Sequence, residues 1–358
     1  MSSPENVVPL TPGAVFLTEI HEQPSALRAL LEHERSYARV ADTARKRGAT
    51  TIRMVGHGSS DNAASYGVYA FGLLPRWTAL RDSITLTAYY HAGLDMTGST
   101  VIALSQSGRT PDVIDYLTRA RAAGAFTIAL TNDVSSDLAA AAEAVLPLAA
   151  GPERSVAASK TYLNQIAALG LLAASAAGEG RRFAAGIRAT ADLLEDAIPS
   201  LEEQVREVAL SFASVGRMFV VGRGIEFATA REIALKLLET CRVAAEPLTA
   251  TALAHGPVAA LDPLFPVWTV ASDDETLPAV VEAAERVRAA GATLVASGDA
   301  AAALSGAAYT LAVPKPPTPL HSPLLSVVPG QLFASALARA RGLDPDHPVG
   351  LSKVTLAR

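Results

Sequence analysis

Hydrophobic and polar positions alternate along the chain in blocks that predict strands and helices in turn. Short apolar runs rich in β-branched residues are typical of buried strands. In the first part of the chain such runs occur at Ile52–Val55, Ile84–Thr87, Val101–Leu104, Thr127–Leu130 and Val145–Leu148. Helical patterns separate several of them, most clearly at 113–123. This alternation predicts an open, largely parallel α/β sheet that binds ligands beyond the carboxyl ends of its strands.

The same order of elements returns about half a chain later. Met218–Val221 is followed by the glycine pair Gly222 and Gly224 and by a helical pattern at Ala228–Leu238, as 52–55 is followed by Gly56 and Gly58. Further predicted strands lie at 267–271, 293–296 and 309–313, with a helix at 282–290. The recurrence indicates an internal duplication of one α/β unit. The predicted fold class is therefore α/β, with two tandem, doubly wound parallel sheets.

Three regions follow from this pattern. Residues 1–45 are expected to be an N-terminal helical segment, in which Leu27, Leu30 and Leu31 recur at helical spacing and would serve docking or dimer contact. A long apolar helix is expected from Lys160 to about Ala177, followed by a charged helical linker. The first domain is therefore placed at 46–185 and the second, with a C-terminal tail, at 186–358.

Composition narrows the function classes. The chain has 358 residues, half of them hydrophobic, and a formal net charge of −5, which gives no reason to expect nucleic acid or an anionic membrane as a partner. The single cysteine, Cys241, excludes an internal disulfide, a cysteine-rich zinc site and a glutamine-hydrolysing cysteine near the N-terminus. With no signal-like or membrane-spanning stretch, we expect a soluble, cytoplasmic protein that needs no metal or other cofactor.

Candidate phosphate chemistry is concentrated after the predicted strand at 101–104. There Ser105, Gln106, Ser107 and Thr110 offer neutral donors, and Thr110 with the proline after it is typical of a helix N-terminus. Free backbone N–H groups and the helix dipole favour an anion at such a place. A second loop, 56–60, contributes Ser60 at another strand end and lacks the third glycine of a dinucleotide fingerprint. An ordinary polar turn is the alternative to a phosphate site.

Charged residues elsewhere have both a structural and a catalytic interpretation. Lys236 and Glu239 are three apart, so they share a helix face and could form a surface ion pair. His255 stands in a loop punctuated by glycine and proline and could be structural, and Lys353 in the C-terminal tail could be a solvated charge. A shielded carboxylate can act as a general base, an imidazole as a proton shuttle and a lysine as a nucleophile towards a carbonyl.

Taken together, four motifs in order resemble a known family. They are Leu104-Ser105-Gln106-Ser107-Gly108, Leu235-Lys236-Leu237-Leu238-Glu239, His255-Gly256-Pro257 and Leu351-Ser352-Lys353. From about residue 45 to 353 the chain resembles the tandem sugar isomerase (SIS) module of glucosamine-6-phosphate synthase. Because that enzyme's glutaminase domain has no counterpart in the sequence, the chain is more similar to stand-alone two-domain SIS proteins, which include glucosamine-6-phosphate deaminases and phosphosugar isomerases.

The resemblance implies a role for each matching residue. Those that match the family's sugar-phosphate contacts are Ser60, Ser105, Gln106, Ser107 and Thr110. Glu239 matches the carboxylate that moves a proton between C1 and C2, with Lys236 beside it. His255 matches the ring-opening histidine, which in the family comes from the other subunit of a homodimer with shared active sites. Lys353 matches the tail lysine that contacts the open-chain sugar and can form a Schiff base.

Several positions depart from the synthase. His57 replaces a cysteine, Arg109 a glutamate and Ala158 a serine, while Ala252 and Ala254 replace a glutamate and a lysine near the histidine motif. Because of these departures, the resemblance does not fix which sugar is bound, and in particular which group the sugar carries at C2. The expected activity is an aminohexose-6-phosphate deaminase that turns glucosamine 6-phosphate into fructose 6-phosphate and ammonia. The alternatives are a phosphosugar isomerase that releases no amine and a non-catalytic sugar-phosphate sensor.

Overall fold

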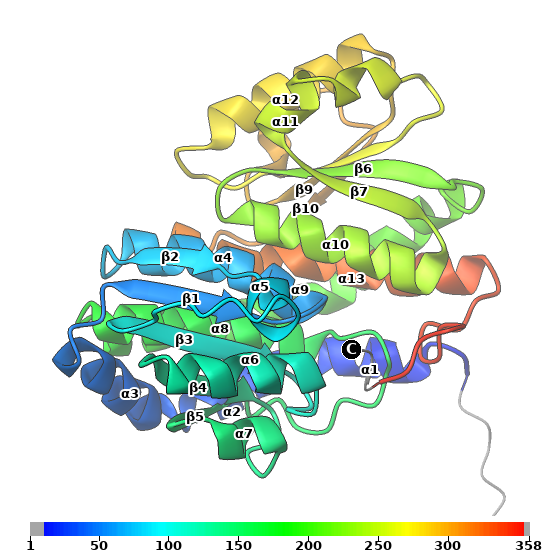
Figure 1. The fold of residues 1–358 in the computed structure, drawn as a ribbon. Coiled ribbons are helices and arrows are strands. Elements are labelled where there is room, and N and C mark those ends of the chain that lie inside the picture. Colours follow the sequence, from blue (N-terminus) through cyan, green and yellow to red (C-terminus); the bar gives the residue numbers. More distant parts are fainter. Residues whose placement is uncertain (1–10, 354–358) are drawn as a thin grey trace, which may run out of the picture.

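A computed structural model describes residues 11–353 as two parallel sheets with helices on both faces (Figure 1). The first sheet has the order β2-β1-β3-β4-β5, with β1 (Thr51–Val55), β2 (Thr78–Arg81), β3 (Ser99–Ser105), β4 (Phe126–Thr131) and β5 (Ala144–Pro147). The second has the order β10-β9-β8-β6-β7, with β6 (Arg217–Gly222), β7 (Ala244–Thr249), β8 (Val267–Val270), β9 (Leu294–Gly298) and β10 (Tyr309–Ala312). Counted from its own first strand, each sheet has the order 2-1-3-4-5, so the predicted fold class is confirmed.

Helices fill the connections between the strands. Those of the first part are α1 (Ala14–His21), α2 (Gln23–Leu31), α3 (Glu34–Lys46), α4 (Ser59–Leu73), α5 (Ile84–Ala88), α6 (Pro111–Ala122), α7 (Asp137–Ala141) and α8 (Lys160–Ala176). Those of the second are α9 (Gly180–Ser211), α10 (Glu226–Cys241), α11 (Ala250–Ala254), α12 (Leu277–Ala289) and α13 (Ser322–Ala340), with short 3-10 helices at η1 (Pro257–Ala260), η2 (Ala301–Ala303) and η3 (Pro319–His321).

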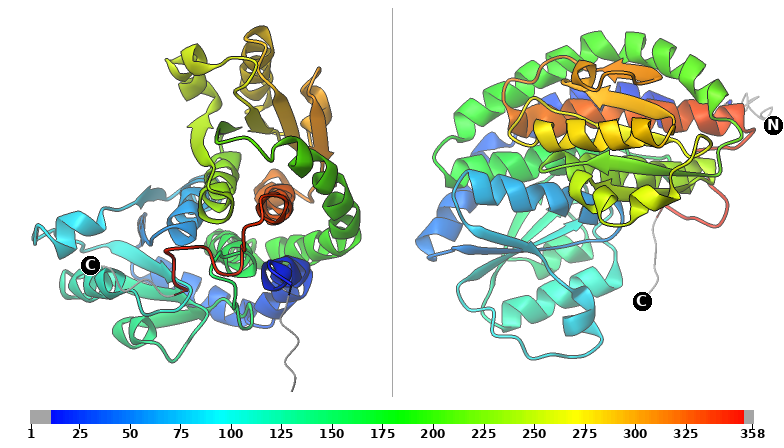
Figure 2. Two further views of the ribbon diagram at one scale, coloured as in Figure 1. Left: turned by 90° about the vertical axis from the view of Figure 1, so that its right-hand side faces the viewer. Right: turned by 90° about the horizontal axis from the view of Figure 1, so that it is seen from above.

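One hydrophobic core joins the two halves. It contains Ile102 and Leu104 of the first sheet together with Val220 and Trp268 of the second. Helices α10 and α13 lie between the sheets (Figure 1), and α9 curves along one side of the molecule toward the second domain (Figure 2). Every residue of the apolar helix α8 is buried. Packing on both faces explains why the central strands are continuous apolar runs rather than alternating ones.

The parallel register brings the loops after the first sheet's strands to one edge. Val55 at the end of β1 pairs with Ala103, and Ser105 at the end of β3 pairs with Thr131 at the end of β4. The turn after β1 and the loop after β3 therefore lie side by side. This edge is where ligands bind in open α/β sheets.

The prediction of a strand at Ile84–Thr87 is wrong, because this segment is helix α5. Ile84 and Thr87 are buried at a spacing of three, whereas Leu86 is 44% exposed, which suits one helix face on the core. Two strands were not predicted, β2 and β7. Both lie at sheet edges and each has two exposed residues, so they lack the apolar run that marks a central strand.

The N-terminal region differs in detail from the prediction. Its described part, which starts at residue 11, holds three helices, and Leu27, Leu30 and Leu31 are buried in the chain's own core. They are therefore not available as a dimer contact. The domain limit placed between residues 185 and 186 falls inside α9, a helix of 32 residues, and it stays a prediction.

Candidate active site

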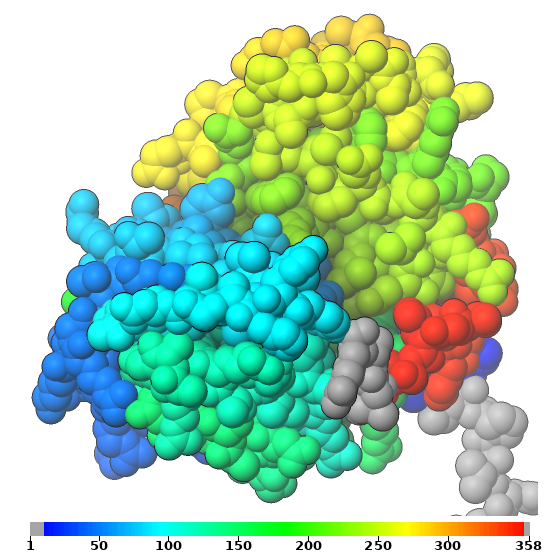
Figure 3. Space-filling model, in the orientation of Figure 1, coloured from blue at the N-terminus to red at the C-terminus, as the bar shows by residue number. Residues whose placement is uncertain are grey.

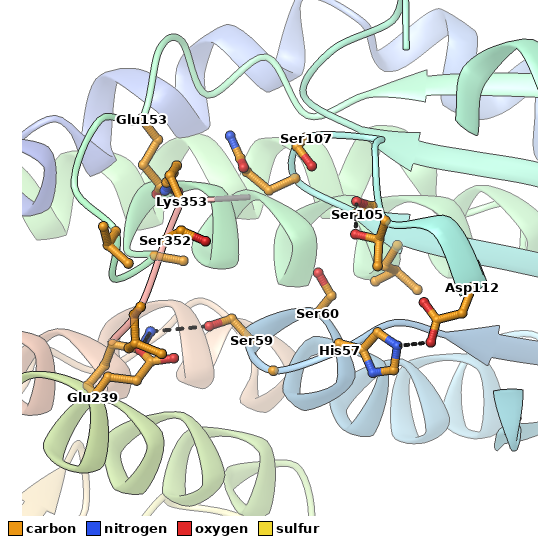
Figure 4. A pocket seen from close by; sticks show the side chains of 18 of the residues that line it. His57, Ser59, Ser60, Ser105, Ser107, Asp112, Glu153, Glu239, Ser352 and Lys353 are labelled. Atoms are coloured by element: carbon orange, nitrogen blue, oxygen red, sulfur yellow. Dashed lines mark hydrogen bonds and ion pairs between the residues drawn. The ribbon is translucent and has the colours of Figure 1, made fainter. Parts of the chain in front are cut away.

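A cavity of about 680 Å³ opens at the carboxyl edge of the first sheet (Figure 4). Its walls come from the turn after β1, the loop after β3, the segment before α8, helix α10 and the C-terminal tail. The tail, red in the space-filling view, lies beside the junction of the two domains (Figure 3). Eight sequence-predicted site residues line this cavity: Ser60, Ser105, Gln106, Ser107, Thr110, Lys236, Glu239 and Lys353.

Hydroxyl groups of the loop after β3 have oxygens that already accept hydrogen bonds from the backbone. The N–H of Gly108 donates to Ser105 Oγ at 3.1 Å, and the N–H of Arg109 donates to Ser107 Oγ at 3.3 Å. The hydroxyls of Ser105 and Thr110 are 3.2 Å apart, so one donates to the other. With the oxygens occupied as acceptors, the remaining hydroxyl protons are free to meet an anion at the N-terminus of α6.

Glycines allow the close packing of this edge. Gly108 has a φ of +64°, and a Cβ there would lie 2.0 Å from Ser136 Oγ. A Cβ on Gly56 would lie 2.8 Å from the Cβ of Ser60. Side chains at these two positions would therefore displace the loop or Ser60.

Ser60 adds a hydroxyl from the first turn of α4. Its Oγ accepts a hydrogen bond from Gln165 Nε2 on α8 at 2.9 Å. Gln106 also lines the cavity, and its carbonyl accepts the N–H of Asn132 at 3.2 Å. The phosphate-binding residues expected from the sequence thus come together at one end of the cavity, around the ends of β1 and β3.

Helix α10 presents a lysine between two carboxylates. Lys236 Nζ lies 2.5 Å from Glu239 Oε2 and 3.4 Å from Glu232 Oε1. It also donates to Ser59 Oγ at 3.3 Å. The side chains of Lys236 and Glu232 are 1% and 0% exposed, whereas that of Glu239 is 23% exposed and faces the cavity. This pair is therefore not a surface pair.

Burial and charge oppose each other in this cluster. Burial raises the pKa of Glu232, against the lowering effects of the Lys236 ammonium and of hydrogen bonds from Asn62 and Ser59, both at 2.8 Å. For Lys236 burial alone would lower the pKa, but the neighbouring carboxylates of Glu232 and Glu239 raise it above its ordinary value. Lys236 therefore stays an ammonium and can stabilise negative charge in the cavity.

The tail places Lys353 opposite α10. Its Nζ donates to Glu153 Oε2 at 2.6 Å. The buried Glu153 also accepts from the backbone N–H groups of Ser159 and Thr161, both at 3.0 Å, and from the Thr161 hydroxyl at 2.7 Å. Burial raises the pKa of Glu153, but Lys353 and these hydrogen bonds outweigh it and hold the pKa below its usual range. Glu153 is thus an anchor for the lysine.

Hydrogen bonds to α1 hold the cavity wall formed by the segment before α8 and the tail. Buried Glu19 accepts the N–H of Arg154 at 2.5 Å and the N–H of Ser155 at 3.3 Å, and burial raises its pKa to about 7. Asp346 of the tail accepts N–H groups of the first turn of α1 at 2.7 and 3.1 Å, while its carbonyl accepts the N–H of Val156. The two ends of the described chain therefore position Glu153 and Lys353 jointly.

His255 is the predicted site residue that the structure does not bring to this cavity within one chain. It is exposed at the end of α11 in the second domain. Among the departing positions, His57 lies at the rim and its Nε2 is 2.8 Å from Asp112 Oδ2, as Figure 4 shows. Ala158 lines the cavity, while Arg109 does not and lies 3.6 Å from Asp133.

Sequence reasoning missed Glu232, Glu153 and the pair of His57 with Asp112. Glu232 precedes Lys236 by four residues, so helical spacing could have placed it on the same face. No spacing rule could have paired Glu153 with Lys353, because 200 residues separate them.

Among residues 11–353 there is neither an activated thiol nor a cluster of metal ligands. Cys241 is buried, its thiol donates to the carbonyl of Ala334, and burial raises its pKa to about 11, so it is not an activated nucleophile. Between residues 11 and 353, no group of three or more His, Cys, Asp or Glu side chains could hold a metal ion. In the same range no helix combines the length and apolarity needed to cross a bilayer.

Comparison with known proteins agrees with the fold and the motifs. The model of the SIS domain matches residues 46–175 and again 211–340. A curated relative, glutamine–fructose-6-phosphate aminotransferase (isomerizing) of Aeropyrum pernix, is 35% identical over 353 residues, which cover 94% of this chain and 56% of that protein. The chain thus spans little more than half the length of such relatives.

Two solved structures are similar over almost the whole chain. A provisionally assigned phosphosugar isomerase of Silicibacter pomeroyi has 31% identity and a TM-score of 0.81, and the match covers 94% of this chain and all of that one. The C-terminal domain of glucosamine-fructose-6-phosphate aminotransferase from Francisella tularensis has 22% identity and a TM-score of 0.86, with 97% of this chain and all of that one covered. The second likeness shows the fold alone.

Proposed function

The chain belongs to the SIS domain family, and on that premise we propose that it is an aminohexose-6-phosphate deaminase. Its proposed reaction converts glucosamine 6-phosphate and water into fructose 6-phosphate and ammonia. The name of the Aeropyrum pernix relative includes fructose 6-phosphate, which supports this ketose as the product. The similar structure from Silicibacter pomeroyi is described as a phosphosugar isomerase, which supports a sugar phosphate as the ligand class from which the proposal starts.

One observation carries the proposal, namely that one cavity holds hydroxyl donors at one end and a carboxylate with two lysines at the other (Figure 4). Ser60, Ser105, Ser107 and Thr110 would bind the phosphate. Glu239 and the two lysines would then face the carbon end of the open-chain sugar. A volume of about 680 Å³ leaves room for a hexose phosphate.

In the proposed mechanism Glu239 carries the proton. Its carboxylate removes the proton from C2 of the open-chain 2-amino aldose and returns a proton to C1. The amino group loses one proton and the C1 oxygen gains one, which gives a ketimine at C2 and a hydroxyl at C1. Water adds to the ketimine and ammonia leaves, so that fructose 6-phosphate remains. The buried ammonium of Lys236, 2.5 Å from Glu239, would stabilise negative charge that develops on the sugar oxygen during the transfer.

Two further residues complete the proposed site. Lys353 would hold the open chain and could form a Schiff base with the ketose, once a ligand draws it away from Glu153. His255 would open the sugar ring from the partner subunit of a homodimer, because in its own chain it lies outside the cavity. The proposed active site is therefore shared between subunits.

An isomerase that releases no amine is the second candidate. It is supported by the likeness to the Silicibacter pomeroyi structure, which covers both chains almost completely at 31% identity. Ala158 in the cavity, where the synthase has a serine, also weakens the case for one particular group at C2.

The test is incubation of the purified protein with glucosamine 6-phosphate in the absence of glutamine. We expect ammonia and fructose 6-phosphate in equal amounts, measured by coupled assays, with glucose 6-phosphate and fructose 6-phosphate as parallel substrates. Interconversion of a neutral sugar phosphate without ammonia release would replace the deaminase by the isomerase. Binding without any turnover would favour a sensor.

A further inference from the structure

Ser60 differs from the loop hydroxyls in the source of the hydrogen bond that its oxygen accepts. Backbone N–H groups donate to Ser105 Oγ and Ser107 Oγ. The oxygen of Ser60 receives its hydrogen bond from a side chain, Nε2 of Gln165, at 2.9 Å. Gln165 is 2% exposed on the buried helix α8 and does not line the cavity.

We infer that Gln165 is a positioning residue that turns the hydroxyl proton of Ser60 toward the phosphate of the substrate. This inference rests on the proposed function, in which the cavity binds a sugar phosphate. A hydroxyl has one proton and two acceptor positions. When the amide N–H occupies an acceptor position, the proton points elsewhere, and Ser60 lines the cavity. A phosphate offers only acceptors, so it binds hydroxyls that keep their protons available.

The orientation of the Gln165 amide decides whether Gln165 or Ser60 donates the hydrogen bond between them. With its oxygen toward Ser60, Gln165 would accept the hydroxyl proton and withdraw it from the cavity. In the structure the amide nitrogen Nε2 faces Ser60 Oγ at 2.9 Å, so Gln165 donates and does not compete for the Ser60 proton. Substitution at residue 165 therefore acts on phosphate binding without removing any group that touches the ligand.

Two variants separate orientation from packing. Gln165→Met keeps the length of the side chain and removes the amide, and Gln165→Glu places a proton acceptor beside Ser60. We expect Gln165→Met to raise the dissociation constant for inorganic phosphate about five- to tenfold, the effect of one ordinary hydrogen bond. Gln165→Glu should raise it further. Because the phosphate is remote from the reacting carbons, kcat should stay within about twofold while KM rises.

A matched control is Gln331→Met. Gln331 is also a buried glutamine with a side-chain partner, Gln23, and it lies on α13 outside the cavity. Its substitution should lower the melting temperature without changing phosphate affinity. Equal weakening of phosphate binding by Gln331→Met and Gln165→Met would show general loosening and would overturn the inference.

Calorimetry with inorganic phosphate and with glucosamine 6-phosphate reads out these effects independently of turnover. Ser107→Ala distinguishes a failure of the positioning role from a failure of the proposed function. If Ser107→Ala weakens phosphate binding and neither Gln165 variant does, the positioning role is wrong while the proposed function stands. If Ser60→Ala and Ser107→Ala also leave binding unchanged in folded protein, the cavity is not a phosphate site and the proposed function fails.

Discussion

The two domains share one strand order, yet the loops at the carboxyl edges of their sheets carry opposite chemistry. In the first domain the segment from Ser105 to Thr110, at the end of β3, carries hydroxyls, an amide and one cation, Arg109, and it contains no acidic residue. In the second, the loop between β8 and α12 reads Ser272-Asp273-Asp274-Glu275-Thr276. Three acidic residues there would repel a phosphate. The strand order alone therefore does not create the site.

The second domain also fills the corresponding places with its own groups. Asp274 Oδ1 accepts the N–H of Thr276 at 2.7 Å at the start of α12, where the first domain leaves room for an anion. Glu226 takes the position that corresponds to Ser60, and its buried carboxylate accepts from the hydroxyls of Ser272 at 2.6 Å and Ser326 at 2.8 Å. An internal carboxylate thus stands where a ligand would bind, and function follows from loop residues rather than from the fold.

In the proposed active site, the two domains instead contribute residues to one cavity. Helix α10, which follows the first strand of the second sheet, carries Lys236 and Glu239 into the cavity of the first domain. If this division is correct, Glu239→Gln should lower turnover by roughly 10²–10⁴ because it removes the proton carrier and keeps the shape. Ligand affinity, measured by calorimetry, should change little. Undiminished exchange of the C1 or C2 hydrogen with solvent would mean that another group is the base.

A carboxylate introduced into the loop after β3 would make this loop of the first domain acidic, like the corresponding loop of the second. We expect Ser107→Asp to weaken binding of glucosamine 6-phosphate by about 10²-fold, because a like charge facing the phosphate costs several kcal/mol. Ser107→Ala should cost about 1–3 kcal/mol, since it removes one donor. Calorimetry measures both affinities.

The matched control for that prediction is Glu275→Ser in the second domain. Glu275 is exposed in the corresponding loop, so its neutralisation should leave the affinity for the sugar phosphate unchanged. If Glu275→Ser changed the affinity as much as Ser107→Asp does, phosphate binding would not be confined to the carboxyl edge of the first sheet.

The sequence predicted what depends on local pattern. The central strands, the loop after β3 and the shared face of Lys236 and Glu239 follow from period and spacing. The edge strands β2 and β7 were missed because their exposed residues carry no apolar run. The anchoring of Lys353 by Glu153 depends on a tertiary contact between distant segments, which no local pattern encodes.

The position of His255 raises the question of whether the second domain of one subunit also contributes to the cavity of its partner. It belongs to the second domain, which in its own chain supplies Glu239 to the cavity and leaves the histidine exposed outside it. We expect His255→Ala and Glu239→Gln proteins, each nearly inactive, to recover activity when mixed and allowed to exchange subunits. In a twofold dimer half of the molecules would be heterodimers with one intact site each, so about a quarter of the wild-type activity should return.

Mass spectrometry of differently tagged subunits would establish the exchange independently of activity, and a mixture of Glu239→Gln with inactive Glu239→Ala serves as the control that cannot complement. If subunits exchange and no activity returns, His255 and Glu239 act within one protomer's site, or His255 does not act in the reaction. Recovery in the mixed sample alone would assign the histidine to the partner's cavity. The second domain of each chain would then serve two sites, its own through α10 and its partner's through the loop after α11.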